Sequence, residues 1–305
     1  MGRLHEVDSR REAVLPACCL IGRAPICDLV LSARDTSSQH ASLEWTGSIW
    51  ELHDLGSKNG TFVDGGRIGR GEKLPLRRGQ RIRFAQQGGT WELADDAPPR
   101  PMAVELRTGE VRLSNGGLLA LPSDDAPLVT LHGESSERWM LERGHEIEAV
   151  GDRAIVPVAD GLWRVHLATR ASGTLDEPSG GLRVAELTLC FSVSRNEEYV
   201  ELVVRGRGRV FDLKARAHHY PLLLLARERA QQRAAGSARA EAGWIHQDRL
   251  LDMLRMDVSH LNISIHRSRV QLAQEGVVDA VKLIERRPGT RQLRIGVESL
   301  EFARL

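Results

Sequence analysis

The chain has 305 residues, of which 41% are hydrophobic and 27% charged, and its net charge is +1. A chain of this length suggests two or three domains, and the composition is ordinary for a globular protein. No apolar stretch approaches the roughly 18 residues that a membrane span needs, and the charged N-terminus lacks the apolar centre of a signal peptide. We therefore expect a cytoplasmic protein that makes no contact with a membrane.

Residues 1–98 read as many short strands separated by glycine-rich turns. Two alternating runs, "ASLEW" (41–45) and "IWELHDL" (49–55), are joined by "TGS", and further turn signals follow at "SKNG", "VDGG" and "LRRGQ". Short strands at this density are typical of a β-sandwich, whose end loops can gather polar residues into a site. This segment holds 13 basic and 13 acidic side chains, so its overall charge gives no hint of a partner.

Three separated polar motifs lie in the predicted loops of this segment: Gly22-Arg23, Ser37-Ser38-Gln39-His40 and Ser57-Lys58-Asn59-Gly60. An arginine offers paired N–H donors to phosphate oxygens, and hydroxyl groups and loop amides can complete the shell. A serine and a histidine could also be a nucleophile and its base, but no acidic residue is placed to orient such a base. The residues therefore predict a phosphate-binding site and no catalytic one.

In this order and at this spacing, the three motifs resemble the forkhead-associated (FHA) domain, over about residues 4–95. The resemblance implies a phosphothreonine-peptide reader. It implies that Arg23 and Ser37 hold the phosphate through their side chains and Ser38 through its backbone N–H. Lys58 would approach the phosphate, and Asn59 would bond the peptide backbone.

The same resemblance implies structural roles for Gly22, His40 and Gly60, with the ring of His40 bracing the loop that aims Ser37. Position 38 is often arginine or another long polar residue in the family, and here it is serine. A shorter side chain leaves the main-chain donor of Ser38 in place.

Residues 99–181 predict an acidic, β-rich spacer module followed by a linker. Residues 99–198 carry 10 basic and 16 acidic side chains, and several short apolar runs predict strands. Trp139 and Trp163 are expected to anchor one small β core. The segment 169–181, rich in glycine, serine and proline, is expected to be the linker.

Residues 182–305 predict a small antiparallel sheet, then three helices, then a basic hairpin. Strand patterns at "LRVAELTLCFSVS", "YVELVV" and "RVFDLKA" precede helical patterns at "HHYPLLLLARERAQQ", "HQDRLLDMLR" and "DVSHLNISIHRSRVQLAQEG". Two strands around "RPGTRQ" complete the segment. Residues 199–305 hold 19 basic and 12 acidic side chains, which indicates an anionic partner for this part of the chain.

This element order resembles the winged-helix DNA-binding output domain of response regulators, over about residues 199–296. The resemblance implies base contacts near Ile263 and Arg267, and backbone contacts near Ser264, His266 and Arg269. The predicted wing places three further arginines, Arg286, Arg287 and Arg291, for contact with phosphates or the minor groove. The family usually has a core leucine where this chain has Ser268, and lysine where it has Gln271.

Helical geometry gives a test of that resemblance. At 100° per residue, Leu261, Ile265 and Leu272 share one face and should be core. Ile263, Arg267 and Val270 lie roughly opposite, where an apolar side chain beside an arginine suits the major groove. The alternative is a helix buried on both sides against the acidic middle region.

The expected chemistry of the chain is binding rather than catalysis. There is no phosphate loop, metal-ligand cluster or convincing triad, so we expect no metal, no cofactor and no enzyme activity. The four cysteines, Cys18, Cys19, Cys27 and Cys190, have spacings that fit neither a zinc site nor a disulfide framework, which predicts free thiols. Two functions remain open: a transcription regulator that couples Ser/Thr phosphorylation to DNA binding, and an FHA adaptor whose C-terminal region contacts protein.

Overall fold

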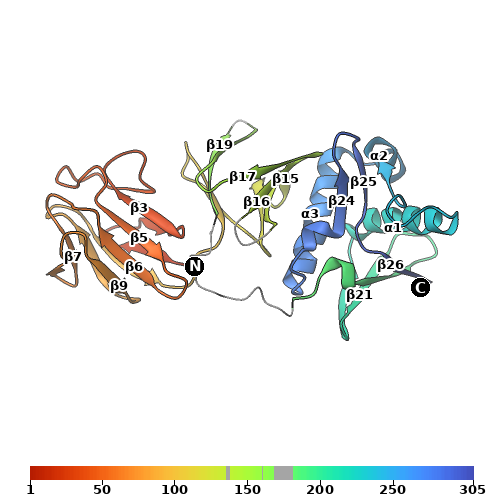
Figure 1. Cartoon of the computed structure of the whole chain (residues 1–305), viewed down its shortest axis with the longest axis horizontal. Helices are drawn as coiled ribbons and strands as arrows, with labels where there is room; N and C mark the ends of the chain where they lie inside the picture. The colour runs from red at the N-terminus through yellow and green to blue at the C-terminus, as the bar shows by residue number, and fades with distance from the viewer. Residues whose placement is uncertain (135–137, 160, 168–180) are drawn as a thin grey trace. The chain divides into compact units, whose positions relative to one another are not determined.

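The computed structural model describes residues 1–134, 138–159, 161–167 and 181–305. It is rich in β-strands, and three α-helices occur in these described ranges (Figure 1). Contacts divide the described residues into two compact units: 1–113 with 151–156 and 163–167, and 114–150 with 157–162 and 181–305, apart from 135–137 and 160. The predicted linker 169–181 lies, except for Gly181, outside the described residues.

The first unit contains an FHA-type β-sandwich. One sheet has the order β2-β1-β11-β10-β7-β8 and the other has the order β4-β3-β5-β6-β9. The strands of the first sheet are β1 (Arg3–Glu6), β2 (Glu12–Val14), β7 (Thr61–Val63), β8 (Gly66–Arg67), β10 (Arg81–Phe84) and β11 (Thr90–Asp95). Those of the second are β3 (Cys18–Gly22), β4 (Leu29–Val30), β5 (Ala41–Trp45), β6 (Trp50–Asp54) and β9 (Lys73–Leu76).

Alternating sequence explains how these two sheets bury a core. Along β6 the side chains alternate between buried and half-buried positions, as the period of two predicts for a strand with one covered face. Buried side chains from both sheets, among them Leu43 and Trp50 of one and Ile82 and Trp91 of the other, form one hydrophobic cluster. The predicted strand pair 41–45 and 49–55 is confirmed, because β5 pairs with β6 in antiparallel register.

The middle of the chain contributes two separate sheets. One sheet has the order β13-β12-β19-β18, and the other has the order β14-β15-β16-β17. The bounds are β12 (Met102–Glu105), β13 (Val111–Leu113), β14 (Leu118–Ser123), β15 (Ala126–Gly133), β16 (Trp139–Arg143), β17 (Glu146–Val150), β18 (Ile155–Val158) and β19 (Gly161–His166). Trp139 lies on β16 and Trp163 on β19, in different sheets, and both are buried, so the expectation of one small core around them stays a prediction.

The C-terminal residues form a four-stranded sheet, three helices and a three-stranded sheet. The larger sheet has the order β22-β21-β20-β26 and the smaller has the order β23-β25-β24. The bounds are β20 (Thr188–Val193), β21 (Val200–Gly206), β22 (Arg209–Ala215), α1 (His219–Ala234), β23 (Ile245–His246), α2 (Gln247–Leu254), α3 (Val258–Gln274), β24 (Ile284–Arg287), β25 (Gln292–Ile295) and β26 (Ser299–Arg304). The three predicted helices and the β24–β25 hairpin are therefore present.

Local chemistry explains where α3 begins and which face it buries. The side chain of Asp257 accepts a hydrogen bond from the N–H of His260 at 2.9 Å, which caps the helix. Leu261, Ile265 and Leu272 are buried in the C-terminal core, as the helical spacing predicts. On another side, α3 packs against β15, and the β15–β17 strands lie beside this helix in Figure 1.

Candidate functional site

Three loops of the sandwich meet where the predicted phosphate site lies. The N–H of Arg23, after β3, donates to the carbonyl of Ser37, before β5, at 3.0 Å, and the N–H of Ala24 donates to the carbonyl of Ser38 at 3.0 Å. A Cβ atom added at Gly22 would lie 2.4 Å from the carbonyl oxygen of Ser38. Glycine at position 22 therefore permits the close approach of the two loops.

The buried side chain of His40 connects the loop before β5, which holds Ser37, to the loop between β6 and β7, which holds Gly60. Its ring is fully buried, its Nδ1 accepts the N–H of Ser37 at 3.2 Å, and its Nε2 lies 3.1 Å from the carbonyl oxygen of Gly60. The neutral tautomer with hydrogen on Nε2 satisfies both bonds. Burial lowers the pKa of His40, although the bond to the Gly60 carbonyl opposes the shift, so the ring stays neutral near pH 7.

A buried carboxylate holds the third loop, between β6 and β7. Asp54 accepts the N–H groups of Gly56 and Ser57 at 2.9 Å each, and the hydroxyl groups of Ser57 and Thr61 at 2.6 Å each. Burial by itself raises the pKa of Asp54, but these hydrogen bonds outweigh it and the pKa is lowered. The turn is thereby fixed on an ionised internal anchor.

The turn between β6 and β7 donates two hydrogen bonds to the loop before β5. The N–H of Lys58 donates to the Oγ atom of Ser37 at 3.1 Å, and the amide Nδ2 of Asn59 donates to the carbonyl of Asp35 at 2.6 Å. Because the Ser37 oxygen accepts from Lys58, its own O–H is left to donate outward. The side chain predicted to bond a peptide backbone, Asn59, is engaged with Asp35 and helps to shape the site.

The side chains gathered here are mostly donors that lack an acidic partner. The Nε of Arg23 donates to the carbonyl of Thr36 at 3.2 Å, which orients the guanidinium, and Arg23, Ser38 and Lys58 are exposed. Among the described residues, neither Arg23 nor Lys58 forms an ion pair with a carboxylate. An oriented guanidinium, a free hydroxyl and an ammonium on one rigid surface are suited to bind an anion such as phosphate.

The predicted recognition helix is in a different situation. His266 and Arg269 are buried, and the Nε2 of His266 lies 2.9 Å from Asp124 while Arg269 contacts Glu142 at 3.0 Å. Arg267 remains exposed and contacts Asp125 at 2.9 Å. The expectation that His266 and Arg269 face a nucleic-acid backbone is not met here, because acidic residues of the β14–β17 sheet cover them.

The apolar side of that helix is also more covered than predicted. Ile263 and Ser264 are half-buried and line an open groove of about 1060 Å³ between α2 and α3. The expectation that Val270 faces solvent is wrong, since only 9% of its surface is exposed. The helix meets a sheet where solvent was expected, which is the alternative that the sequence left open.

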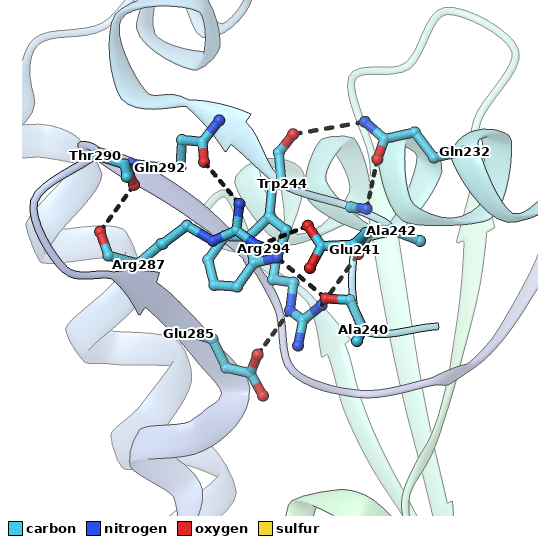
Figure 2. Close-up of polar contacts among 11 residues, drawn as sticks. Gln232, Ala240, Glu241, Ala242, Trp244, Glu285, Arg287, Thr290, Gln292 and Arg294 are labelled. Carbon is cyan, nitrogen blue, oxygen red and sulfur yellow. Dashed lines mark hydrogen bonds and ion pairs between the residues drawn. The ribbon is translucent and has the colours of Figure 1, made fainter. Parts of the chain in front are cut away.

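The predicted wing arginines are likewise engaged within the C-terminal unit. Arg286 is buried and donates to Glu142 at 2.7 Å, so the expectation that it touches a phosphate is not met in this arrangement. The guanidinium of Arg287 lies 4.7 Å from the Trp244 ring and contacts Glu241 at 2.7 Å, as Figure 2 shows. Arg291 is exposed and contacts Asp248 at 3.3 Å.

Glu142 is one of the residues that sequence reasoning missed. Burial by itself raises the pKa of Glu142, but the charges of Arg269 and Arg286 outweigh it and lower the pKa. Burial of the Arg269 guanidinium lowers its pKa, and the charge of Glu142 opposes that shift. A single sequence gives no signal for this ionic group of three side chains, because Glu142 lies 127 residues from Arg269 and 144 residues from Arg286.

Comparisons with known proteins agree with the sandwich and its loops. Residues 19–85 match the model of the FHA domain. The FHA domain-containing protein FhaB of Mycolicibacterium smegmatis is 44% identical over 57 residues, and FhaB of Mycobacterium tuberculosis is 42% identical over 57 residues. Each match spans 19% of this chain and 37% of the relative's length.

Among solved structures, EmbR of Mycobacterium tuberculosis in complex with a low affinity phosphopeptide is 30% identical. That match covers 32% of this chain and 25% of EmbR, with a TM-score of 0.28. The match of residues 19–85 to the FHA model shows that the chain carries an FHA domain in its N-terminal part.

Two further findings concern the whole described chain. No group of three or more His, Cys, Asp or Glu side chains that could hold a metal ion occurs among the described residues. No helix in the described ranges combines the length and the apolar composition that crossing a membrane requires.

Proposed function

We propose that this protein is a binding protein of Ser/Thr-kinase signalling rather than an enzyme, and that its FHA domain binds phosphothreonine on a partner, for example a kinase or one of its substrates. The observation that carries this proposal is that the carbonyl of Thr36 orients the exposed Arg23 guanidinium at 3.2 Å, while the next residue, Ser37, accepts the Lys58 N–H at its hydroxyl oxygen at 3.1 Å. Doubly charged phosphate suits such a set of charged and neutral donors. The expected place of action is the cytoplasm.

The test is a comparison of matched peptides. The full-length protein is titrated with an oriented library of phosphothreonine peptides, and the selected sequence is then resynthesised with unphosphorylated threonine and with phosphoserine. We expect binding to the phosphothreonine peptide and loss of most affinity for the unphosphorylated one. Equal affinity for these two peptides would remove the proposal.

We also propose a second candidate function, regulation of transcription through DNA binding by the C-terminal unit. It is supported by the order of sheet, three helices and hairpin, by the resemblance to winged-helix output domains, and by the excess of basic residues in 199–305. The burial of Arg269 and Arg286 instead favours an adaptor whose C-terminal unit contacts protein. DNA backbone contacts by His266 and Arg269 of α3 would require release of the β14–β17 sheet from this helix.

Two carboxylates in the turn between β14 and β15 offer a way to decide between these candidates. In full-length protein, Asp124→Asn with Asp125→Asn removes the charges that contact His266 and Arg267. If α3 reads DNA, this variant should bind duplex DNA more tightly, and log K should fall against log salt with a slope of about −0.9 per phosphate contacted. The matched control is Glu146→Gln with Glu148→Gln, two exposed carboxylates of β17.

The adaptor reading makes the opposite forecast for the same titration. Neither variant, nor the unchanged protein, should then show salt-sensitive binding to any duplex in a random-sequence selection. That outcome would remove DNA recognition and leave phosphothreonine reading untouched, because the two functions are measured with different ligands.

A further inference from the structure

A basic hollow lies directly beside the candidate phosphothreonine site. It has a volume of about 400 Å³ and is bounded by the turn between β6 and β7 and by the chain after β8. Its lining includes three cationic side chains, Lys58, Arg67 and Arg70. A volume of this size lies within the range of protein sites for small ligands.

The three cations have no acidic partner in the described part of the chain. Lys58, Arg67 and Arg70 are all exposed, and none of them forms an ion pair or a side-chain hydrogen bond with a described residue. This contrasts with Arg286 and Arg287, which each contact a carboxylate at 2.7 Å. The hollow therefore has an unbalanced positive charge, which an anionic ligand would neutralise.

The acidic side chain in the lining does not supply the missing balance. Asp54 is buried and already accepts hydrogen bonds from two N–H groups and two hydroxyl groups of the turn. Its oxygens are directed into the turn that it stabilises. The outer surface of the hollow is left to the three cations.

Two glycines set the position of the arginines. A Cβ atom added at Gly60 would lie 2.4 Å from the Nε of Arg67, and one added at Gly56 would lie 3.0 Å from the Nε of Arg70. Both glycines have a φ of +83°, a conformation that disfavours any side chain. The guanidinium groups thus lie against the bare backbone of the turn, where larger residues would displace them.

The hollow and the candidate phosphate site share one residue. The backbone N–H of Lys58 donates to Ser37 at 3.1 Å, while the side chain of Lys58 lines the hollow. A peptide whose phosphothreonine contacts Ser37 therefore has one of the three cations of the hollow, Lys58, next to it. We propose that these three cations form a second anion subsite, which takes a second negatively charged side chain, phosphorylated or carboxylate, of the same peptide. This inference rests on the proposed function of the FHA domain.

The experiment uses full-length protein and a set of phosphothreonine peptides in an uncharged background. Each peptide carries one additional phosphoserine, at one position between three residues before and four residues after the phosphothreonine. A parallel set carries glutamate at the same positions, so that the two sources of negative charge are compared directly. We expect one position at which phosphoserine raises affinity by about tenfold at low salt, and a smaller gain with glutamate.

Variants then assign the gain to the hollow. Arg67→Ala with Arg70→Ala should abolish the gain and leave the affinity for singly phosphorylated peptide unchanged, whereas Arg67→Lys with Arg70→Lys should retain part of it because the charge remains. The matched control is Arg77→Ala with Arg78→Ala, two exposed arginines in the turn after β9. A melting curve of each variant verifies that the sandwich is folded.

Two results would overturn the inference. One is an equal gain at every position, or a gain that both double alanine variants reduce alike, since either indicates nonspecific attraction. The other is tight binding of the singly phosphorylated peptide with no gain anywhere. If no phosphothreonine peptide binds at all, the proposed function fails and the second subsite fails with it, which is a distinct result.

Discussion

His40 shows how a single buried side chain can set the geometry of an exposed site. It bridges the N–H of Ser37 and the carbonyl of Gly60 without reaching the surface itself. A residue placed in this way acts on ligand binding through the loops that it holds. Removing the His40 side chain should therefore lower the stability of the folded FHA domain first, and ligand binding only as a consequence.

We expect His40→Ala to lower the free energy of unfolding by about 2–4 kcal/mol, because it removes two hydrogen bonds and leaves a cavity. Phosphopeptide affinity should fall as a consequence of the loosened loops. Urea unfolding and a peptide titration on the same sample measure both effects. His53→Ala, a half-buried position on β6, is the control, and a fully stable His40→Ala protein that binds no phosphopeptide would indicate direct contact instead.

Arg23 is the complementary case: its side chain lies at the surface and contributes little to stability. Arg23→Ala should weaken binding of a phosphothreonine peptide by roughly tenfold to a hundredfold, since removing a charged hydrogen-bond partner costs about 1.5–3 kcal/mol. The melting temperature should hardly change. Isothermal titration beside Arg10→Ala, an exposed arginine between β1 and β2, separates this contact from general charge loss, and equal affinities of the two variants would count against the assignment.

The three loops of the candidate site could be predicted because each motif is local in sequence, while the ligand contacts assigned to their residues stay predictions. Gly22-Arg23 and Ser37 to His40 bring their own turn chemistry, and the strands on either side fix where the loops meet. The anchor of the third loop, Asp54, was missed, since a buried aspartate before a turn looks like any loop residue. Arg67 and Arg70 were missed as well, because their side chains occupy space that is open only where Gly60 and Gly56 lack a Cβ atom.

At the scale of elements, the β14–β17 sheet changes what α3 can do. Glu142 accepts hydrogen bonds from the guanidinium groups of Arg269 and Arg286, and these three side chains are no more than 7% exposed. Removing one member of a buried ionic group is strongly destabilising, because the others keep their charge without a partner. The contact between this sheet and α3 is thus stabilised by ionic contacts as well as by packing.

Glu142→Gln should lower the free energy of unfolding of the C-terminal unit by about 3–5 kcal/mol. The shape of the side chain is kept, so the loss reports the charge. Hydrogen exchange of the amides of α3 and β16 is the measurement, and it should rise in both elements together. Glu146→Gln, exposed on the neighbouring strand, should leave exchange unchanged, and unaltered protection in the Glu142 variant would show that packing alone holds the sheet.

The elements of the C-terminal unit were predictable in type and order, but their partners were not. The helical period places α1, α2 and α3, the cap Asp257 marks the start of α3, and the turn "RPGT" places the hairpin. Nothing in the residues 114–150 indicates that their strands cover α3. Ser268 and Gln271 illustrate the difference: Ser268 is buried and donates to the Ser264 carbonyl at 2.8 Å, and Gln271 accepts from two histidines of the chain before and within α1.

At the scale of the whole molecule, histidines make stability depend on pH. Burial lowers the pKa of seven described histidines, and that of His219 falls to about 4. A folded-state pKa below the unfolded value means that the unfolded chain binds more protons on acidification. Stability is therefore full above about pH 6.5 and decreases as the pH falls towards the folded pKa values.

For His219 alone the loss should reach about 3 kcal/mol between pH 6.5 and pH 4. Urea unfolding at pH 7.5, 6.0 and 5.0 should give a decreasing midpoint. His219→Asn should be less stable at neutral pH and lose less on acidification, whereas His260→Asn, at an exposed position, should follow the unchanged protein. A midpoint that rises on acidification would contradict the sign of this effect.

The last strand of the C-terminal sheet has a consequence for the timing of folding. β26 pairs in parallel with β20, and Thr188 and Ser299 are 111 residues apart. During synthesis the FHA sandwich can close as soon as residue 95 is free, and β20 can pair with β21, but the other edge of β20 stays unpaired until β26 has been made. A nascent or truncated chain without residues 299–304 would leave an unpaired edge at β20, which carries the buried Leu189 and Phe191. An unpaired edge of this kind is prone to aggregate, so a chain that lacks β26 is exposed to chaperones and proteases even when its FHA domain is already folded.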